Sequence, residues 1–192
     1  MTDAGADASQ ISLGNPGFAK VGETVRFQGR MVKMSTVEWE GPDGSQFERD
    51  YVGHPGAVAV VPMLDDGSVV LVRQFRTPLG VETLELPAGI MDKDGESAHD
   101  AAARELAEET GYVADRLEEL CVMHSAPGWS DERITLFAGT GLVADERDAD
   151  GIEEQFMSSV IVSPDQFDDL VASGALTDAK TILGVLLVRS RA

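Results

Sequence analysis

Hydrophobic and polar positions alternate with a strand-like period through much of the chain, and short turn sequences separate the runs. Residues 21–52 are rich in β-branched and aromatic residues around the turn GPDG, which predicts a β-rich segment. Apolar runs at 57–62 and 69–75 flank the sequence DDGS, which predicts a β-hairpin. The other predicted strands cover residues 82–86, 117–124, 134–141 and 157–162.

The spacing of apolar residues changes to a helical period at residues 98–110. Ser97 is the expected N-cap of this helix, and Gly111 is expected to end it. Its apolar positions, which are small or branched and suit close packing on a sheet, are Ala98, Ala102 and Leu106. Two closing helices are predicted over 164–172 and 177–188. The order of strands, helix, strands and helices predicts an α/β fold in which helices sandwich a mixed sheet.

Three segments are expected along the chain. Residues 1–20 are small and polar and predict a flexible arm. Residues 21–54 form the β-rich extension, and residues 55–192 form the main domain. The 192 residues, of which 43% are hydrophobic, suffice for one domain with a proper core and a small appendage.

The strong acidity of the chain limits its partners. Its net charge is −19, with 34 acidic against 15 basic residues, which argues against nucleic acid or an anionic membrane surface as a partner. Solubility or a salty cell interior is the simplest explanation of the excess. A small phosphorylated substrate stays compatible, provided that arginines and metal ions bind it locally.

The cysteine content and the lengths of the apolar runs give no sign that the protein is exported. Cys121 is the single cysteine and lies among apolar neighbours, so we expect a buried, inert thiol in a reducing cytoplasm. The three histidines are too scattered for a zinc site. No apolar run reaches the length of a membrane span, and the first residues lack the basic and apolar regions of a signal peptide. We therefore expect a cytoplasmic protein.

Three glutamates stand at helical spacing inside the helix predicted at 98–110. Glu105, Glu108 and Glu109 are three and four positions apart, so they project from one helical face. Such a strip of negative charge repels itself unless a cation lies there. Divalent ions prefer hard carboxylate oxygens, so the strip predicts a metal site. A solvated acidic face is the alternative.

The segment ELPAGIMDKDGESAHDAAARELAEETGYV, residues 85–113, resembles the signature of the Nudix hydrolases. Every fixed position of that signature is present: Gly89, Glu96, Arg104, Glu105, Leu106, Glu108, Glu109, Gly111 and Tyr112. The spacer at 90–95 has six residues where the signature usually has five. This extra residue falls in the loop before the helix, where an insertion costs least, and it leaves the carboxylate spacing intact.

The resemblance implies a Nudix α/β/α sandwich that hydrolyses a pyrophosphate bond with Mg²⁺ or Mn²⁺ as cofactor. The metal ligands that it implies are Glu105, Glu108, Glu109 and a backbone carbonyl of Ala88 or Gly89. Arg104 joins the catalytic set as the residue that holds a carboxylate, Glu96 or Glu105, in orientation. An ordinary surface salt bridge is the alternative for Arg104. Gly89, Glu96 and Gly111 are expected to shape the site.

The flanks of the signature resemble the ADP-ribose pyrophosphatase branch of the family. That branch has a proline about fifteen residues past the signature, and Pro127 stands at this distance from Tyr112. The sequence GWSDE that follows also resembles the branch. Trp129 is a candidate to stack on the adenine or a ribose, although an aromatic residue in such a turn often only packs.

Two arginines before the signature are candidates for phosphate contacts, since a guanidinium binds phosphate oxygens in a bidentate manner. Arg76 is favoured because it lies past the predicted strand. Arg73 is the second candidate, with an ordinary surface charge as an equal alternative.

The base that deprotonates the attacking water is expected outside the helix, whose carboxylates would hold metal. In the resembled branch an acidic loop supplies this base. The corresponding loop here covers residues 144–154, and Glu153 and Glu154 match the position, with Glu154 slightly favoured. The other acidic residues of this loop are interpreted as solvated.

The resulting hypothesis is hydrolysis of ADP-ribose to AMP and ribose 5-phosphate. The resemblance also implies a homodimer formed through the strands at 21–54. Another nucleoside diphosphate derivative, such as GDP-mannose, another ADP-sugar or a dinucleotide, is the first alternative substrate. A non-catalytic module that senses ADP-ribose is the second alternative. It should have lost metal-binding glutamates, and all of them are present here.

Overall fold

The computed structural model describes residues 13–145 and 156–191 of the chain. It divides the chain into two compact units, Met1–Gly53 and His54–Ala192. Most of the arm predicted at 1–20 lies outside the described residues, but Ala19 and Lys20 already belong to the first strand. In the part of the chain that is described, no helix is long and apolar enough to cross a membrane.

The first unit is an antiparallel sheet with the strand order β1-β2-β3. Its strands are β1 (Ala19–Gln28), β2 (Lys33–Glu40) and β3 (Gln46–Gly53). The predicted β-rich character of residues 21–52 is therefore confirmed. The central strand β2 buries Val37 together with the polar residues Ser35 and Thr36. Strand β1 leaves Val21, Val25 and Phe27 exposed, so this unit has a small core and an apolar surface.

The second unit combines two sheets with helices. Its strands are β4 (Ala57–Pro62), β5 (Val69–Arg76), β6 (Val81–Glu85), β7 (Ala88–Ile90), β8 (Tyr112–His124), β9 (Arg133–Ala144) and β10 (Ser158–Val162). Its helices are α1 (Ala98–Thr110), α2 (Pro164–Ala172) and α3 (Ala179–Arg191). One sheet has the antiparallel order β10-β5-β6, and the other has the mixed order β7-β4-β9-β8, in which β4 and β9 are parallel.

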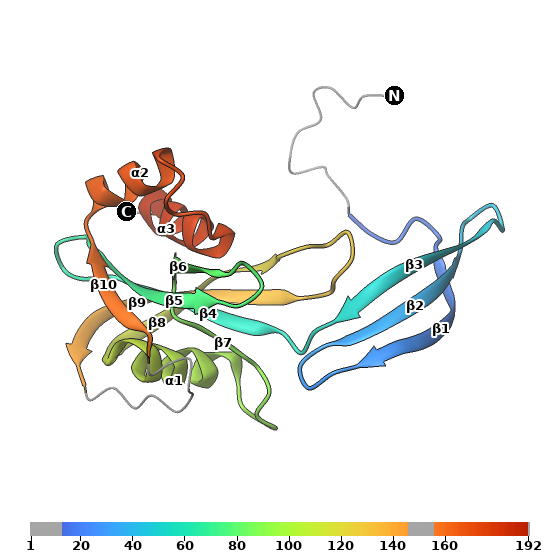
Figure 1. Cartoon of the computed structure of the whole chain (residues 1–192), viewed down its shortest axis with the longest axis horizontal. Helices are drawn as coiled ribbons and strands as arrows, with labels where there is room; N and C mark the ends of the chain where they lie inside the picture. Colours follow the sequence, from blue (N-terminus) through green and yellow to red (C-terminus); the bar gives the residue numbers. More distant parts are fainter. Residues whose placement is uncertain (1–12, 146–155, 192) are drawn as a thin grey trace. The chain divides into compact units, whose positions relative to one another are not determined.

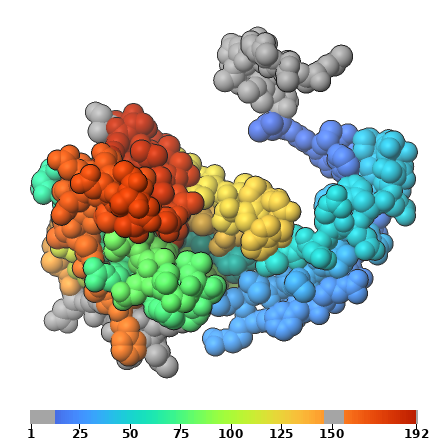
Figure 2. All heavy atoms as spheres, turned by 45° about the horizontal axis from the view of Figure 1, so that its top comes forward, coloured from blue at the N-terminus to red at the C-terminus, as the bar shows by residue number. Residues whose placement is uncertain are grey.

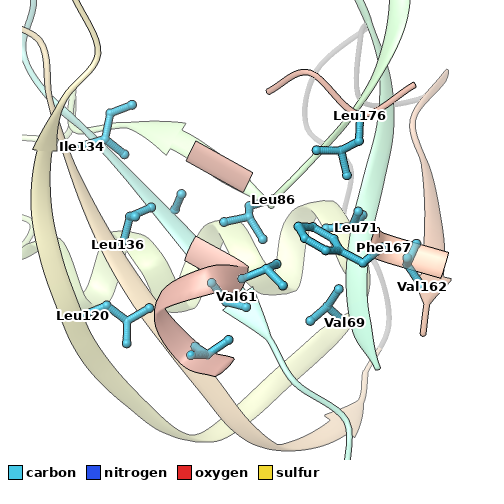
Figure 3. Close-up of a cluster of buried hydrophobic side chains, with 13 residues drawn as sticks. Val61, Val69, Leu71, Leu86, Leu120, Ile134, Leu136, Val162, Phe167 and Leu176 are labelled. Atoms are coloured by element: carbon cyan, nitrogen blue, oxygen red, sulfur yellow. The ribbon is translucent and has the colours of Figure 1, made fainter. Parts of the chain in front are cut away.

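Strand β4 is buried on both faces and separates two layers of the core. Successive side chains of a strand point to opposite faces, so Val58 and Val60 pack with α1 and Phe137. Ala59 and Val61 instead join the larger cluster that α2 and α3 cover, drawn in Figure 3. Figure 1 shows α1 on one side of the sheets and α2 with α3 on the other. The predicted α/β fold with helices on both sides of a mixed sheet is confirmed.

Helix α3 lies unusually close to the sheets. A Cβ atom at Gly184 would come within 2.8 Å of Val61 and 3.0 Å of Leu86, which is shorter than normal carbon contacts. Figure 2 shows the side chains of β10, α2 and α3 as a continuous layer in orange and red. This close contact places the first turn of α3 beside the segment that follows β6.

The predicted hairpin between β4 and β5 is wrong as a strand pairing, although its turn forms. Gly67 N–H bonds to the Leu64 carbonyl at 2.9 Å, and one bridge joins Met63 to Val69. Beyond this bridge the two strands enter different sheets. The reason is burial, because β4 is apolar on both faces and is stabilised by neighbours on both edges, β7 and β9.

Several predicted elements differ from the observed ones at their ends. Strand β8 begins directly after Gly111 and β9 continues to Ala144, because the two strands pair along their whole length. Helix α3 runs from Ala179 to Arg191 rather than from 177 to 188. Strand β7 was not predicted, since three residues after a proline carry no strand pattern, and it forms through pairing with β4.

Candidate active site

Helix α1 carries the predicted glutamates, and both of its ends are fixed by local hydrogen bonds. The side chain of Ser97 accepts a hydrogen bond from the Asp100 N–H, as an N-cap does. Gly111 has φ 71°, and its N–H donates to the Ala107 carbonyl at 2.9 Å. A left-handed residue at this position favours glycine. Both predicted caps are confirmed, and together they define the register of the helix.

Arg104 is the centre of a charged cluster on α1. Its Nε and Nη2 donate to the two carboxylate oxygens of Glu96 at 2.9 and 3.0 Å. Its Nη1 donates to Glu105 at 2.6 Å and to Glu108 at 2.9 Å. Bonding to Glu96 raises the pKa of Arg104 most, and the same bond lowers the pKa of Glu96. Three carboxylates therefore share one guanidinium.

Gly89 is required by the close approach of Glu105. A Cβ atom at residue 89 would lie 2.0 Å from both Cδ and Oε1 of Glu105. No side chain fits in that space while the carboxylate occupies it. The glycine of β7 thus forms one wall of a cradle, and α1 supplies the carboxylate that lies in it.

Glu109 points toward the same short strand. Its Oε2 accepts a hydrogen bond from the Ala88 N–H at 2.9 Å, and its side chain is buried. A buried carboxylate is costly unless it is hydrogen-bonded. The peptide at Ala88 therefore lies directly beside the acidic face of α1.

The glutamates of α1 have the type of oxygen ligand that a divalent cation prefers, but their side chains do not converge on one point. Within residues 13–145 and 156–191, no three His, Cys, Asp or Glu side chains converge as ligands. Arg104 holds Glu105 and Glu108, whereas Glu109 turns to the Ala88 N–H. Their oxygens are the hard donors that Mg²⁺ and Mn²⁺ prefer, and the missing Cβ of Gly89 leaves the space in which the Glu105 carboxylate lies. The residues present thus fit such an ion.

The two candidate phosphate-binding arginines have different surroundings on β5. Arg76 forms a bidentate pair with Glu85, with Nε–Oε1 and Nη2–Oε2 distances of 2.7 Å. This bond raises the pKa of Arg76. The side chain of Arg76 is 40% exposed and that of Glu85 only 5%. Arg73 is exposed and lies opposite Leu84 in the sheet.

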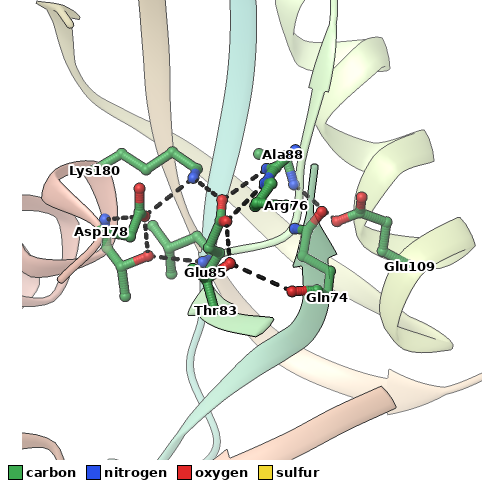
Figure 4. A network of polar contacts seen from close by, with 10 residues as sticks. Gln74, Arg76, Thr83, Glu85, Ala88, Glu109, Asp178 and Lys180 are labelled. Atoms are coloured by element: carbon green, nitrogen blue, oxygen red, sulfur yellow. Dashed lines mark hydrogen bonds and ion pairs between the residues drawn. The ribbon is translucent and has the colours of Figure 1, made fainter. Parts of the chain in front are cut away.

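Glu85 also contacts one residue of another element that the sequence pattern did not single out (Figure 4). Lys180 Nζ, from the first turn of α3, donates to Glu85 Oε2. Lys180 also lies 3.0 Å from Asp178 Oδ2. Burial acts to raise the pKa of Glu85, but Arg76 and Lys180 outweigh it and lower that pKa to about 2. The signal in the sequence that could have identified Lys180 is that it is a single lysine among the apolar residues of a closing helix.

Gln74 is a further buried polar residue near this network. Its side-chain Nε2 is the buried nitrogen that lacks a hydrogen-bond partner among the described side chains. Figure 4 shows its amide between Glu85 and Glu109. No pattern in the sequence selects it, because an isolated glutamine within an apolar strand is usually a satisfied packing residue.

The predicted substrate loop lies between β8 and β9. The Trp129 N–H bonds to the Ala126 carbonyl at 3.1 Å, which forms a tight turn around Pro127. The Trp129 side chain is 59% exposed, so its ring is open to solvent. Asp131 of the same loop accepts a hydrogen bond from the His54 N–H at 2.9 Å. The described bonds thus anchor this loop to the start of the unit.

The candidate bases Glu153 and Glu154 lie outside the described residues, as does most of the acidic loop at 144–154. Their assignment stays a prediction. Of that loop, Ala144 ends β9, and the Asp145 N–H bonds to the Gly111 carbonyl at 2.7 Å. The loop therefore begins at the C-terminal end of α1.

The chain is similar to one protein-family model and to several known proteins. The family model described as NUDIX domain matches residues 53–185. A methanol dehydrogenase activator of Bacillus methanolicus and an ADP-ribose pyrophosphatase of Bacillus subtilis are each 36% identical over 159 residues, which cover 83% of this chain and 85% of either protein. An ADP-ribose pyrophosphatase of Mycobacterium tuberculosis is 38% identical over 149 residues, covering 78% of this chain and 72% of that protein.

A solved structure agrees on the fold. The crystal structure of an ADP compounds hydrolase superposes with a TM-score of 0.79 at 23% identity. The match covers 93% of this chain and 96% of that one. At this identity the likeness establishes the architecture, including the layers of helices and sheets described above.

Proposed function

Since the chain belongs to the Nudix hydrolase family, we propose that it hydrolyses the pyrophosphate bond of ADP-ribose, releasing AMP and ribose 5-phosphate. The observation that carries the chemistry is the placement of Glu105 in the cradle at Gly89, beside the other glutamates of α1. The choice of ADP-ribose is supported by the two ADP-ribose pyrophosphatases that the chain resembles over most of its length.

The family's hydrolases generally need a divalent metal ion. We propose Mg²⁺ or Mn²⁺, held by Glu105, Glu108, Glu109 and the backbone carbonyl of Ala88. Such an ion neutralises charge on the phosphate oxygens and makes water a better nucleophile. The role proposed for Arg104 is to orient the carboxylates, and its four hydrogen bonds support this role.

The remaining proposed roles concern the substrate and the attacking water. Arg76 contacts a phosphate through the part of its guanidinium that Glu85 does not occupy, with Arg73 as the second candidate. Trp129 stacks on the adenine or a ribose, and Pro127 shapes that loop. Glu154, or else Glu153, accepts the proton of the attacking water.

The experiment that tests this function is hydrolysis of a nucleotide panel in water labelled with heavy oxygen. Purified protein with Mg²⁺ or Mn²⁺ is offered ADP-ribose, GDP-mannose, another ADP-sugar and a dinucleotide. We expect the highest kcat/KM for ADP-ribose, and the position of the label shows which phosphorus is attacked. Equal kcat/KM values across the panel would refute the substrate assignment, and no hydrolysis of any of them would favour a sensing module.

A variant at the metal site serves as the control for this experiment. Glu109→Gln keeps the size of the side chain and a carbonyl oxygen that still accepts from the Ala88 N–H. It removes the charge that a divalent ion requires. We expect a large loss of kcat, and wild-type turnover at saturating Mg²⁺ would contradict the proposed ligand set.

We also propose a cytoplasmic homodimer whose interface involves the first unit. The exposed apolar residues of the edge strand β1, among them Val25 and Phe27, support this proposal. A sheet edge with an apolar face is a common surface for pairing with a second chain. Light scattering after gel filtration should give the mass of a dimer for the wild-type chain and a monomer for Phe27→Lys, whereas a wild-type monomer would refute it.

A further inference from the structure

We propose that Lys180 is a positioning residue that keeps the charge of Arg76 available to a substrate phosphate by sharing the carboxylate of Glu85. This inference rests on the proposed function, because it deepens the role of Arg76 at the same site. It concerns a residue of α3 whose sequence position lies far from the signature segment.

The geometry around Glu85 shows a carboxylate whose acceptor positions are all used. Arg76 binds both oxygens at 2.7 Å, and Thr83 Oγ1 donates to Oε1 at 2.7 Å. Lys180 donates to Oε2, the oxygen that also binds Arg76 Nη2. Figure 4 shows these donors converging on one carboxylate from β5, β6 and α3. Glu85 is thus held rigidly by two cations from different elements.

The charges of the network explain why a second cation matters. A buried one-to-one pair of Arg76 and Glu85 would orient the guanidinium but would also cancel its charge. Because Lys180 binds the same carboxylate, Glu85 still orients Arg76 while part of its negative charge is balanced from the other side. Asp178 compensates Lys180 in turn, on the side away from Arg76.

The exposure of the two cations also supports a positioning role for Lys180. The side chain of Lys180 is only 10% exposed and that of Arg76 is 40% exposed. A buried ammonium group is costly unless it is paired and hydrogen-bonded, so packing alone would be served better by an apolar residue. Of the two cations on Glu85, Arg76 is the one that solvent, and therefore a dissolved phosphate, reaches.

The hydrogen bond that holds the first turn of α3 to the segment after β6 is made by Thr181, the residue next to Lys180. Thr181 Oγ1 accepts a hydrogen bond from the Leu86 N–H at 2.8 Å. This bond, together with the Ala88 N–H bond to Glu109, fixes the segment between β6 and β7. A substitution at Lys180 leaves both of these bonds in place, so its effect reports mainly on Glu85 and Arg76.

The test compares three variants at one position in the full-length protein with ADP-ribose and Mg²⁺. Lys180→Gln retains an N–H donor without charge, Lys180→Met removes both, and Lys180→Arg retains both. We expect KM to rise about tenfold in the Gln and Met variants, with kcat within about twofold, because a ground-state charge contact is weakened. Lys180→Arg should restore KM.

A matched control lies on the same helix. Arg189 pairs with Asp168 and with the Pro164 carbonyl, outside the Glu85 network. Arg189→Met changes the net charge by the same amount as Lys180→Met, so an unchanged KM shows that the effect is local. Melting temperatures of all variants separate weaker folding from weaker binding.

A double variant decides whether Lys180 acts through Arg76. If it does, Lys180→Gln combined with Arg76→Ala has the KM of Arg76→Ala alone. Additive effects, or an unchanged KM in a well-folded Lys180→Gln protein, would overturn the inference while leaving the proposed function intact. A wild-type protein that does not cleave ADP-ribose refutes the proposed function itself.

Discussion

Two polar clusters of the second unit differ in their charge balance. At α1, two carboxylates of the helix and that of Glu96 in the loop before it bind one guanidinium, that of Arg104. Around Glu85, the cations of Arg76 and Lys180 meet the anions of Glu85 and Asp178. The first cluster has excess negative charge, which attracts cations. The second has equal numbers of cations and anions, and Arg76 is the member of its Arg76–Glu85 pair that is exposed to solvent.

The clusters also differ in how easily their contacts can exchange. The carboxylates around Arg104 have side chains between 12% and 26% exposed, so ions from solvent reach them. Glu85 is almost fully buried and accepts hydrogen bonds from three side chains. We therefore expect metal ions and ionic conditions to affect the α1 cluster, and acid to affect the Glu85 cluster.

The largest effect is expected for Gly89→Ala. The new Cβ would occupy the place of the Glu105 carboxylate, 2.0 Å from its Cδ. Since that carboxylate is the mobile end of a long side chain, the fold should persist while the ligand moves. Displacing a reacting group by about 1 Å can cost about a hundredfold in rate, so we expect kcat/KM to fall by at least that factor in a steady-state assay.

A glycine without close neighbours provides the control for this substitution. No atom lies within 4 Å of the place that a Cβ at Gly14 would take, and the φ of Gly14 is not left-handed. Gly14→Ala should therefore keep wild-type kcat/KM. Full activity of Gly89→Ala would show that Glu105 need not occupy the cradle.

The second effect concerns the charge excess of α1. Arg104→Met removes the cation shared by Glu96, Glu105 and Glu108, so like charges repel and their orientation is lost. Losing such an orienting partner typically costs 10- to 100-fold in activity, and we expect about that loss in kcat/KM. Without metal, the melting temperature should also fall.

Measuring the melting temperatures with added Mg²⁺ tests whether the effect of Arg104→Met is due to charge. Because the ion compensates the carboxylates that Arg104 no longer binds, it should raise the melting temperature of Arg104→Met more than that of the wild type. An equal rise in both proteins would contradict the view that the α1 cluster binds cations.

The third effect tests the balanced cluster with acid. The pKa of Glu85 is lowered to about 2 in the folded protein from an ordinary value of 4.5. A lowered folded pKa stabilises the fold above the unfolded pKa, and this stabilisation is lost as pH falls through the folded pKa. The melting temperature should therefore fall between about pH 4.5 and pH 2, and Glu85→Gln should flatten that dependence.

Glu23 of the first unit offers a comparison over the same pH range. Hydrogen bonds from Lys20, Lys33 and Ser35 lower its pKa to about 2, but its carboxylate lies at the surface. Because surface ion pairs contribute little, Glu23→Gln should change the acid dependence much less than Glu85→Gln. The reverse order would contradict the importance assigned to the buried network.

The smallest effect concerns the helix that carries the acidic cluster. Ser97→Ala removes the side-chain oxygen that accepts from the Asp100 N–H, which should lower the free energy of unfolding by about 1 kcal/mol. Ser97 lies at the opposite end of α1 from Glu109, so kcat/KM should stay near the wild-type value. Chemical denaturation and a steady-state assay measure the two quantities, and a large loss of activity would show that the cap affects the cluster.

Much of the site follows from local sequence, and the structure shows why. Ser97 and Gly111 end a helix through bonds to residues within four positions, so their roles are readable from the chain alone. The contact between Arg104 and Glu108 is likewise a spacing of four on one helix. Arg104 was expected to hold Glu96 or Glu105, and it contacts both, because a short loop brings Glu96 back to the helix.

Other parts depended on segments that are distant in the sequence. Glu85 and Lys180 are separated by 95 positions, and only the packing of α3 brings them together. The turn after β4 was predicted correctly, but the partner of β4 was not, because a strand that is apolar on both faces is equally suited to several neighbours.

The sequence by itself therefore determined the candidate metal site, because a helical period of 3.6 residues places its carboxylates on one face, and the resemblance of residues 85–113 to the Nudix signature supplied the reaction class. It also determined the ends of α1 and the apolar run that forms β4. The tertiary structure decided which strands pair, how closely Gly89 meets Glu105, and which buried charges surround Arg76. The physical reason is that backbone periodicity acts over a few residues, whereas the approach of distant side chains depends on how the layers pack.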